Sequence, residues 1–594
     1  MKFGVLALDY DGTTARDGWL DPDVRTAIAD VRARGIVVVL VTGRILAELK
    51  KFAGDLRFVD AVVAENGAVL SFPNGNTRLL GHSPPKVFLE ELLRREVPFA
   101  AGQCVVETDA VWAPQVLAAI RGLELPLVML FNRGRLMVLP QAISKGIGLR
   151  EALTVLRFSA HNCIGIGDAE NDHDLLSACE FGVAVEWGSQ ALQEIADTIL
   201  PGNGPSAVAP YIRQVAKAMT IPPERVSRSP LTLGTGEDGL PITLAFRSRN
   251  ILIAGEPRSG KSWVNGLACE QLILQGYSVC VIDAEGDYRT LETLPGVVVF
   301  GGEIPPPELP DLTRVLRHPK MSVVVDLSHV PYREKVDYLK TLLPMLAALR
   351  RTTGLPHRIV VDEAHYFLHE PNIRELLDLD LGAYTLATYR LSDLHPDLRA
   401  AIQEVIVKRT ADPREVHTLA AMVGRTDAES EWKAILGGLD VSEAVLLPGA
   451  EAGEGRPVRF RLLPRLTPHV RHKAKYLDVQ LNEELGFVFT EGGKPVSPSI
   501  RTLNEFVSAL ESQSLGALEG HARRGDFSRW IANVFHDHVL ASAIRKVEQR
   551  YRLGHTQNLY NSLAYSIEER YELLPNIQAG RKEALRAAAS KSAS

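Results

Sequence analysis

Short apolar runs that end in polar residues recur along the first two thirds of the chain. Such runs are typical of strands buried on both faces of a sheet, and stretches with helical apolar spacing follow several of them. The runs begin near Phe3, Ile36, Cys163, Asn250, Ser278, His357, Tyr384 and Val405. This alternation predicts α/β domains with polar side chains at the strand ends, where α/β sheets place their ligands.

The length of 594 residues and the position of a proline-rich polar stretch predict several domains. We expect an α/β domain over residues 1–217, with a small α+β cap inserted at about 74–140, and a proline-punctuated linker at 218–230. A second α/β domain is expected over 231–464, followed by a mainly helical domain over 465–594.

Polar groups follow four segments of the first domain in a fixed order. The first run delivers Asp9 and Asp11, and the second ends in Thr42-Gly43-Arg44. Lys145 then opens a helix over 146–153, and the segment 163–172 carries Asp168 and Asp172. Carboxylates, a hydroxyl and a lysine at strand ends and helix starts are the groups that phosphoryl transfer requires.

These motifs resemble the haloacid dehalogenase superfamily, in particular its Cof-like phosphatases, whose Ala-Glu-Asn-Gly-Ala segment is present at 64–68. The resemblance implies a Rossmann-like fold and Mg-dependent hydrolysis of a phosphomonoester. Asp9 would be the nucleophile, Asp11 the general acid and base, and Thr42 and Lys145 would hold the phosphoryl group. The implied magnesium ligands are Asp9, the Tyr10 carbonyl, Asp168 and Asp172.

The cap sequence predicts helices at 87–95 and 113–121 and strands at 103–107 and 127–131. Caps select the substrate in the superfamily, but no cap residue identifies one here. We interpret Arg133 and Arg135 as solvated charges of a turn.

A glycine-bounded loop, Gly255 to Ser262, follows the apolar run at 251–254 and precedes helical spacing at 263–275. It matches the phosphate-binding pattern GxxxxGK[ST], with Ser259 and Gly260 directly before Lys261. Backbone N–H groups of such a loop surround phosphates, the lysine reaches the β and γ phosphates, and the serine holds magnesium. We therefore predict an ATP site.

Two acids follow the apolar run at 359–361. Asp362 would organise magnesium together with Ser262, and Glu363 would polarise an attacking water. A kinase has little use for the second acid, because its acceptor is a substrate and not water. The pair favours ATP hydrolysis.

A hairpin pattern over 231–244 and the series GEPRSGKS, DAEGDY, VVDEAH, ATYRLSDL and KRTADP resemble the HerA and FtsK ring ATPases, most closely HerA, over about 231–464. The resemblance implies a RecA-like domain in a homo-hexamer with DNA in an assembled channel. Arg409, and in second place Arg390, would complete a neighbour's site. Tyr389 stands where members commonly carry glutamine, which makes DNA translocation less supported than ATP binding. Residues 287–289 are candidates for a pore or interface loop.

The last domain is predicted to hold a strand at 486–490 and helices at 503–510, 514–522, 526–535 and 539–552, with a Thr502/Glu505 capping box. The basic stretch at 464–476 is interpreted as a connector. His521, Arg523 and Arg524 are assigned a structural role beside Asp526, a predicted helix cap.

Composition excludes disorder and a strongly basic protein, because 46% of residues are hydrophobic, 23% are charged and the net charge is −6. Five scattered cysteines are expected to be buried, reduced thiols. No signal peptide or membrane-spanning run is apparent, so we expect a cytoplasmic protein without membrane contact.

The leading hypothesis is a phosphatase joined to a HerA-like ATPase in DNA processing or antiphage defence. One alternative is a sugar or small-molecule phosphatase on a scaffolding or regulatory ATPase ring. Another is a polynucleotide kinase-phosphatase that heals ends, and a third treats the ATPase part as a binding module without activity.

Overall fold

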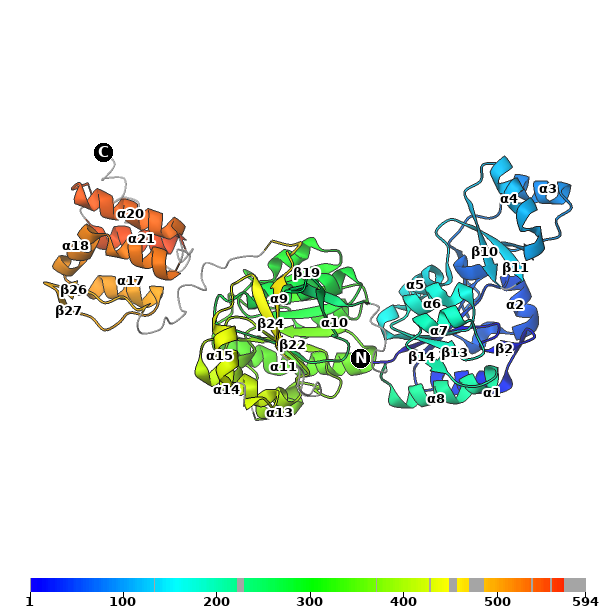
Figure 1. The fold of residues 1–594 in the computed structure, drawn as a ribbon, viewed down its shortest axis with the longest axis horizontal. Helices are drawn as coiled ribbons and strands as arrows, with labels where there is room; N and C mark the ends of the chain where they lie inside the picture. The colour runs from blue at the N-terminus through cyan, green and yellow to red at the C-terminus, as the bar shows by residue number, and fades with distance from the viewer. Residues whose placement is uncertain are drawn as a thin grey trace. The chain divides into compact units, whose positions relative to one another are not determined.

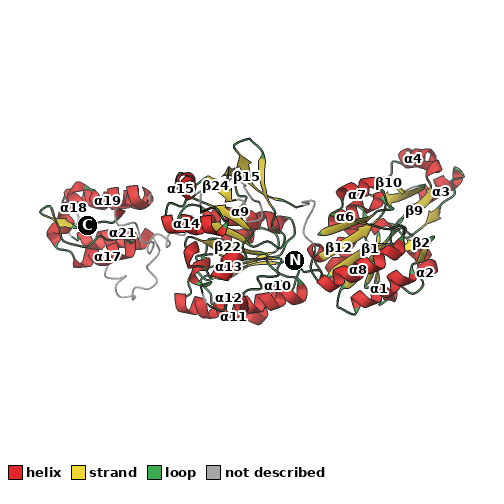
Figure 2. Cartoon of the chain, turned by 60° about the horizontal axis from the view of Figure 1, so that its bottom comes forward, coloured by secondary structure: helices red, strands yellow, loops and turns green. Residues whose placement is uncertain are grey.

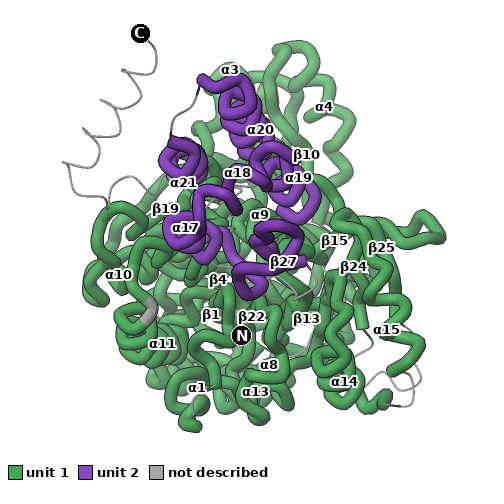
Figure 3. The backbone as a smooth tube through the Cα atoms, turned by 90° about the vertical axis from the view of Figure 1, so that its left-hand side faces the viewer, with its two compact units in different colours: residues 1–469 green, residues 470–594 purple. Residues whose placement is uncertain are grey.

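The computed structural model describes residues 2–132, 134–221, 229–369, 371–426, 429–447, 457–468, 485–535, 538–555 and 558–570. The chain forms two compact units, residues 1–469 and residues 470–594 (Figure 3). Most of the predicted linker at 218–230 and of the basic connector at 464–476 lies outside the described residues.

The first sheet of unit 1 has eight strands in the order β14-β13-β12-β1-β4-β5-β6-β7. Figure 1 labels two of them, β13 and β14. Strands β14 to β5 are parallel, and β6 and β7 continue the sheet antiparallel. The bounds are β1 Val5–Asp9, β4 Val37–Val41, β5 Ala61–Ala64, β6 Val69–Ser71, β7 Thr77–Leu79, β12 Cys163–Gly167, β13 Phe181–Val185 and β14 Thr198–Leu200.

Helices cover both faces of this sheet. Successive strand residues point to opposite faces, so each strand contributes side chains to two separate cores. Leu6 and Leu8 of β1 share a core with α1 (Pro22–Arg32) and α8 (Val208–Ala218). Val5 and Ala7 share another with α5 (Lys145–Leu156) and α6 (His173–Ala178). The predicted Rossmann-like α/β arrangement of the first domain is confirmed.

The insert between β7 and α5 is a small α+β layer. Its antiparallel sheet has the order β10-β11-β9-β8 and carries two helices. The bounds are α3 Lys86–Arg94, β8 Ala100–Ala101, β9 Val106–Asp109, α4 Ala113–Gly122, β10 Leu127–Asn132 and β11 Arg135–Pro140. Both predicted helices are present. Of the predicted strands, 127–131 coincides with β10, whereas 103–107 overlaps only the start of β9.

The second sheet of unit 1 has eleven strands in the order β16-β15-β25-β24-β23-β17-β22-β21-β18-β20-β19. Its strands from β23 to β19 are parallel, and the hairpin β15/β16 lies at one edge (Figure 2). The bounds are β15 Leu231–Gly236, β16 Pro241–Leu244, β17 Ile251–Ala254, β18 Val279–Asp283, β19 Val297–Gly301, β20 Ser322–Asp326, β21 Arg358–Val361, β22 Tyr384–Thr388, β23 Glu404–Val407, β24 Glu443–Leu447 and β25 Val458–Leu462. The main helices beside it are α9 Lys261–Leu274, α10 Leu309–Leu316, α11 Tyr332–Thr353, α14 Pro413–Met422 and α15 Glu429–Gly437.

A buried polar cluster joins residues that belong to the two sheets of unit 1. Glu180, between α6 and β13, accepts hydrogen bonds from Arg247 Nε at 2.7 Å and Tyr277 Oη at 2.8 Å. His161 Nδ1 lies 2.7 Å from the same carboxylate, and its ring stacks on Tyr277 with centroids 3.5 Å apart. Burial alone would raise the pKa of Glu180, but His161 and Arg247 outweigh it and lower that pKa to about 2. Arg247 and Tyr277 precede β17 and β18, so the cluster fastens the strands of the second sheet to the first.

Unit 2 packs helices around an aromatic core of Phe487, Phe489, Phe506, Phe527 and Trp530. The helices are α17 Leu503–Ser512, α18 Leu515–Arg524, α19 Asp526–Trp530, α20 His538–Arg552 and α21 Leu559–Arg570, with a π-helical turn at Ile531–Phe535. The Thr502/Glu505 capping box is confirmed.

Asp526 is not the helix cap that we predicted. Gly525 occupies the N-cap position of α19, with φ +72°, a backbone conformation that glycine adopts without strain. The Asp526 carboxylate instead accepts hydrogen bonds from Arg524 and Arg529 and contacts His521. The cluster is a network of hydrogen bonds within the unit.

Among the described helices, none is both long and apolar enough to cross a bilayer. All five cysteines are buried and free, as predicted.

We predict that Glu180→Gln lowers the free energy of unfolding by about 3 kcal/mol at neutral pH, because it removes the buried carboxylate that pairs with the buried Arg247. The folded-state pKa of Glu180 lies below its ordinary value, so the carboxylate stabilises the fold above that value and loses the effect as pH falls. Calorimetric melting of both proteins at a series of pH values should show the difference shrinking from about pH 5 downward. The exposed Glu194→Gln is the matched control. Equal melting temperatures at pH 7 would contradict the assignment.

Candidate active site

The order of the first sheet brings three predicted side chains to one edge. Strand β1 lies between β4 and β12, and all three run parallel, so their carboxyl ends meet. Asp9 ends β1, Thr42 follows β4 and Asp168 follows β12. All three are buried. The strand order alone therefore assembles a nucleophile candidate, a hydroxyl and a second carboxylate.

Lys145 links this edge to the helix that follows the cap. Its Nζ donates to Asp9 Oδ1 and to Asp172 Oδ1, both at 2.6 Å, and its side chain is 2% exposed. Asp172 also accepts from the backbone N–H groups of Asp168 and Ala169 through Oδ2. Burial alone would lower the pKa of Lys145, but the carboxylates of Asp172 and Asp9 outweigh it and raise that pKa. The lysine is therefore held as a cation between two acids.

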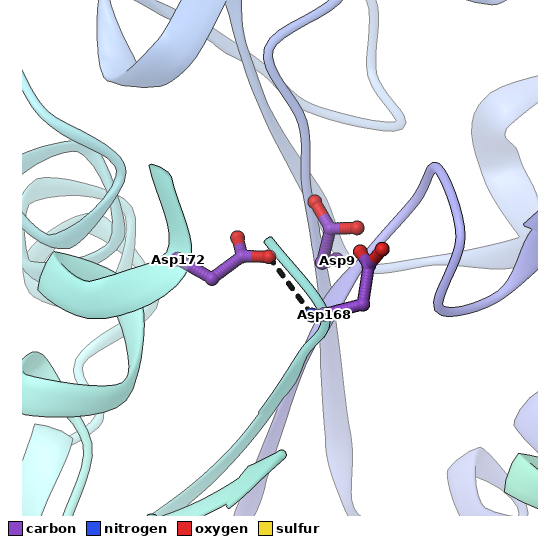
Figure 4. Close-up of side chains that lie close together, drawn as sticks. All are labelled: Asp9, Asp168 and Asp172. Carbon is purple, nitrogen blue, oxygen red and sulfur yellow. Dashed lines mark hydrogen bonds between the residues drawn. The ribbon is translucent and has the colours of Figure 1, made fainter. Parts of the chain in front are cut away.

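Three carboxylates lie close together at this edge (Figure 4). One oxygen each of Asp9, Asp168 and Asp172 lies within 4.8 Å of the others. Burial raises the pKa of Asp9 well above its ordinary range, and the nearby charge of Asp172 adds to the rise. A bound cation would remove that repulsion, and carboxylate oxygens are the ligands that Mg²⁺ prefers. The residues present therefore fit a magnesium ion.

The fourth predicted metal ligand, the Tyr10 carbonyl, is engaged elsewhere. It accepts hydrogen bonds from the backbone N–H groups of Thr14 and Ala15 and from the Thr14 hydroxyl. Its oxygen is thus used in the tight turn after β1, and we do not retain it as a ligand. Gly12 in the same turn has φ +84°, and a Cβ there would meet Asp168 Oδ2 at 2.2 Å. Only glycine lets the turn approach Asp168 so closely.

Asp11, the predicted acid and base, is held by a residue to which we gave no role. Arg44 Nε and Nη2 donate to the two carboxylate oxygens of Asp11, both at 2.7 Å. These hydrogen bonds to the Asp11 carboxylate raise the pKa of Arg44. The sequence did contain a signal for this role of Arg44, because the residue lies two positions after Thr42 at the end of a buried strand.

Comparisons with known proteins find similarity to the amino-terminal domain. The family described as haloacid dehalogenase-like hydrolase matches residues 6–112 and 124–212. Phosphoglycolate phosphatases of Methanosarcina mazei and Methanothermobacter thermautotrophicus are 25% and 28% identical, over 34% and 35% of this chain and 90% and 97% of their own. A solved haloacid dehalogenase-like hydrolase from Bacteroides thetaiotaomicron is 17% identical with a TM-score of 0.31, over 36% of this chain and 100% of its own.

The amino-terminal domain is a haloacid dehalogenase-like phosphatase domain. The family match ends at residue 212, before the second sheet begins. The match therefore covers this domain and does not extend to the second sheet of unit 1.

The phosphatase domain has a cavity of about 370 Å³ above Asp9 and Lys145. Its other walls include Arg44 and four cap residues: Glu107, Asn132, Arg135 and Met137. Arg135 is only partly the solvated turn charge that we predicted, because its Nε donates to Glu107 at 2.7 Å on the cavity wall. Arg133 lies outside the described residues. These cap residues could not be found by motif, because only the strand register brings them here.

The glycine-bounded loop of the second sheet joins β17 to the N-terminus of α9. Gly255 and Gly260 have φ values of +155° and +98°, and a Cβ on Gly255 would meet Lys408 Cβ at 2.6 Å. Ser259 and Lys261 are buried, and Lys261 Nζ donates across the loop to the Glu256 carbonyl at 3.1 Å. The backbone thus has the folded-back form that a phosphate-binding loop requires.

Strand β22 separates this loop from the two acids. It pairs with β17 on one side and β21 on the other, so Asp362 lies one strand further along the same edge. Glu363 is buried and has φ +47°, a strained conformation for a non-glycine residue. Tyr389, just after β22, has its ring 5.7 Å from Lys261 Nζ. The residue that departs from the HerA pattern therefore lies at the site itself.

Arg409 lies beside the loop of its own chain, whereas Arg390 lies beside Tyr389. Arg409 Nε is 3.5 Å from Glu256 Oε2, and Arg390 is 3.7 Å from Asp393. Both side chains are about half exposed. Their predicted role in a neighbour's site stays a prediction.

The segment 287–289, the candidate pore or interface loop, turns inward at its first two residues. The Asp283 carboxylate accepts backbone N–H bonds from Gly286, Asp287 and Tyr288, which turns the segment inward. Tyr288 is fully buried, and Asp287 Oδ2 accepts from Ser262 Oγ at 2.6 Å. Asp287 is therefore a further candidate residue of the site, and the pore or interface role of the segment stays a prediction.

We predict that Lys145→Met lowers phosphatase turnover by at least about 10³-fold and destabilises the fold by about 3 kcal/mol, because Asp9 and Asp172 lose their shared cation. Melting temperatures measured with and without Mg²⁺ test whether repulsion between Asp9 and Asp172 causes the loss of stability. The ion should raise the melting temperature of the variant more than that of the parent, because it relieves the same repulsion. The exposed Lys217→Met serves as the control. A variant that melts like the parent in the absence of Mg²⁺ would refute the buried-cation role.

Proposed function

We propose that the phosphatase domain hydrolyses a phosphomonoester through an aspartyl-phosphate on Asp9. The observation that carries this proposal is the buried Lys145 between Asp9 and Asp172, with Asp168 beside them. Similar proteins carry the names phosphoglycolate phosphatase and, in Bacillus subtilis, 5-amino-6-(5-phospho-D-ribitylamino)uracil phosphatase. Both names describe hydrolysis of a phosphate ester.

Each side chain has a step in this reaction. Lys145 and Thr42 hold the phosphoryl oxygens while an Asp9 oxygen attacks phosphorus and the ester bond breaks. Asp11, oriented by Arg44, gives a proton to the departing oxygen and then takes one from the water that hydrolyses the aspartyl-phosphate. Magnesium held by Asp9, Asp168 and Asp172 would supply neutralisation of the phosphate charge.

We expect Asp9→Asn to reduce turnover of p-nitrophenyl phosphate by at least about 10³-fold, because the amide is not a nucleophile. Asp11→Asn should reduce it by about 10² to 10⁴-fold through loss of the proton transfer. Steady-state rates with Mg²⁺ measure both effects. Asp17→Asn, exposed in the neighbouring turn, should leave the rate unchanged. More than a tenth of the parent rate in Asp9→Asn would overturn the assignment of the nucleophile.

We also propose that the second sheet binds and hydrolyses ATP. Support comes from the folded-back loop 255–262 and from the strand order that places Asp362 and Glu363 near it. Ser262, Asp362 and the newly placed Asp287 would hold magnesium. Glu363 would polarise water, which favours hydrolysis over a polynucleotide kinase reaction.

We expect Lys261→Ala to abolish ATP binding and Glu363→Gln to keep binding while slowing hydrolysis by about 10²-fold. Both are best made in an Asp9→Asn background, so that the phosphatase domain contributes no phosphate release. Calorimetric titration measures binding, and phosphate release with and without duplex DNA measures hydrolysis. Transfer of labelled γ-phosphate to a 5′-hydroxyl oligonucleotide would instead favour the kinase alternative. An unchanged rate of phosphate release by the Glu363→Gln variant would show that Glu363 is not the base.

The homo-hexamer, the DNA channel and a role in DNA processing or antiphage defence stay predictions of the HerA resemblance. The metabolic alternative, a small-molecule phosphatase on a scaffolding ATPase, shares every residue assignment above. Substrate selection by the phosphatase domain is therefore the property that separates the two.

A further inference from the structure

His365 lies in the short 3₁₀ turn Ala364–Tyr366 that follows β21, and its side chain contacts the end of β22. The residue is 6% exposed. Its Nδ1 lies 3.1 Å from Thr388 Oγ1 and 3.6 Å from Glu363 Oε2. The Tyr389 ring packs edge to face against the imidazole, with centroids 4.4 Å apart. One imidazole thus contacts the ends of both strands that flank the candidate ATP site.

The end of β22 connects this histidine to the loop 255–262. The Thr388 carbonyl accepts a hydrogen bond from the Gly255 N–H at 3.2 Å, and the Tyr389 ring lies 5.7 Å from Lys261 Nζ. The lysine of such a loop reaches the β and γ phosphates. We therefore expect the γ-phosphate of a bound ATP on the side of the site where His365 lies.

The two hydroxyl groups at the end of β22 already have partners. Thr388 Oγ1 accepts from the Arg390 N–H at 3.0 Å, so its own proton faces His365 Nδ1. The Tyr389 hydroxyl hydrogen-bonds with the hydroxyl of Tyr366. Both hydroxyl groups are thus engaged within the protein before any nucleotide binds.

The second ring nitrogen of His365 is not engaged. Its Nε2 is buried and has no hydrogen-bond partner within the described part of the chain. Burial lowers the pKa of His365 to about 4 and outweighs the opposing charge of Glu363, so the ring is neutral. Because Nδ1 accepts from Thr388, the one ring proton lies on Nε2. A buried N–H without an acceptor is costly, and an oxygen of a ligand would remove that cost.

His357 shows why the location of the free nitrogen matters. Its Nε2 is also buried without a partner among the described residues, and its side chain is 2% exposed. His357 precedes β21 and His365 follows it, so the two histidines lie at opposite ends of the strand. Since β17, β22 and β21 are parallel, His365 is the one of the two at the edge that carries Lys261.

We propose that His365 recognises the γ-phosphate, with its Nε2–H donating to a γ-phosphate oxygen of bound ATP. ADP lacks this phosphate and makes no such bond, so the contact distinguishes the two nucleotides. The inference rests on the ATP-binding function proposed above for the second sheet. Tyr389, which stands where HerA proteins commonly carry glutamine, then acts by packing against the imidazole.

The test compares the dissociation constants of ADP and of the non-hydrolysable ATP analogue AMP-PNP. Both are measured with Mg²⁺ by calorimetric titration of the full chain, and every protein carries Asp9→Asn so that the phosphatase domain does not consume nucleotide. His365→Phe keeps a ring and removes both nitrogens. It should weaken AMP-PNP binding by at least about tenfold and ADP binding by less than about twofold, because one hydrogen bond to a charged oxygen is lost.

His365→Gln separates the donor from the ring, because its amide keeps an N–H group near the position of Nε2. This variant should bind AMP-PNP within about threefold of the parent. His357→Phe is the matched control, since it removes an equally buried ring from the other end of β21. The control should leave the ratio of the two dissociation constants unchanged.

Four results would overturn the proposal. An equal loss of ADP and AMP-PNP binding in His365→Phe would show a structural role alone. Unchanged AMP-PNP binding in that variant would show that Nε2 does not meet the γ-phosphate. A His365→Gln variant as weak as His365→Phe would exclude the donor. A parent that binds neither nucleotide would overturn the proposed ATP site itself, and the role of His365 with it.

Discussion

The buried pair of contacts from Lys145 to Asp9 and Asp172 is the interaction on which the phosphatase domain depends. Removing a charge from water is costly, and an edge with three carboxylates and one lysine is stable only where the geometry is fixed. The parallel strands β1, β4 and β12 fix one side, and the start of α5 fixes the other. The cost that remains at Asp9 favours a metal ion there, and an anionic phosphoryl group can approach only once such a cation neutralises the carboxylates.

The second sheet meets a similar constraint with different groups. Its loop has no room for a Cβ at Gly255, and Lys261 is directed back across the loop. Asp287 comes to Ser262 because Asp283 folds the intervening turn inward. In both sheets, catalytic candidates lie where a parallel strand ends, and a short turn with glycine at positive φ sets how closely the next group approaches.

Much of this arrangement could be predicted from the sequence. Apolar runs that end in Asp9, Thr42, Asp168 and Asp362 identify buried strands, and parallel strands bring their ends together. Partners that depend on register or on the direction of a turn could not be predicted. Arg44 on Asp11, Arg135 on Glu107 and Asp287 on Ser262 are contacts of this kind. The hydrogen bonds that the Tyr10 carbonyl accepts could not be predicted for the same reason, because its orientation follows from the turn that closes behind it.

The Glu180 cluster bears on whether the two sites of unit 1 influence one another. Asp172 precedes the short helix α6, and Glu180 follows it, so one rigid turn-and-helix segment connects the metal-site carboxylate to Arg247 and Tyr277. Coupling between sites needs an element with two arrangements that each ligand stabilises differently. Here the carboxylate satisfies an arginine, a tyrosine and a histidine at once, and the cost of breaking such a buried set opposes a second arrangement. The contacts therefore favour a fixed attachment between the two candidate sites over transmission of a signal from one to the other.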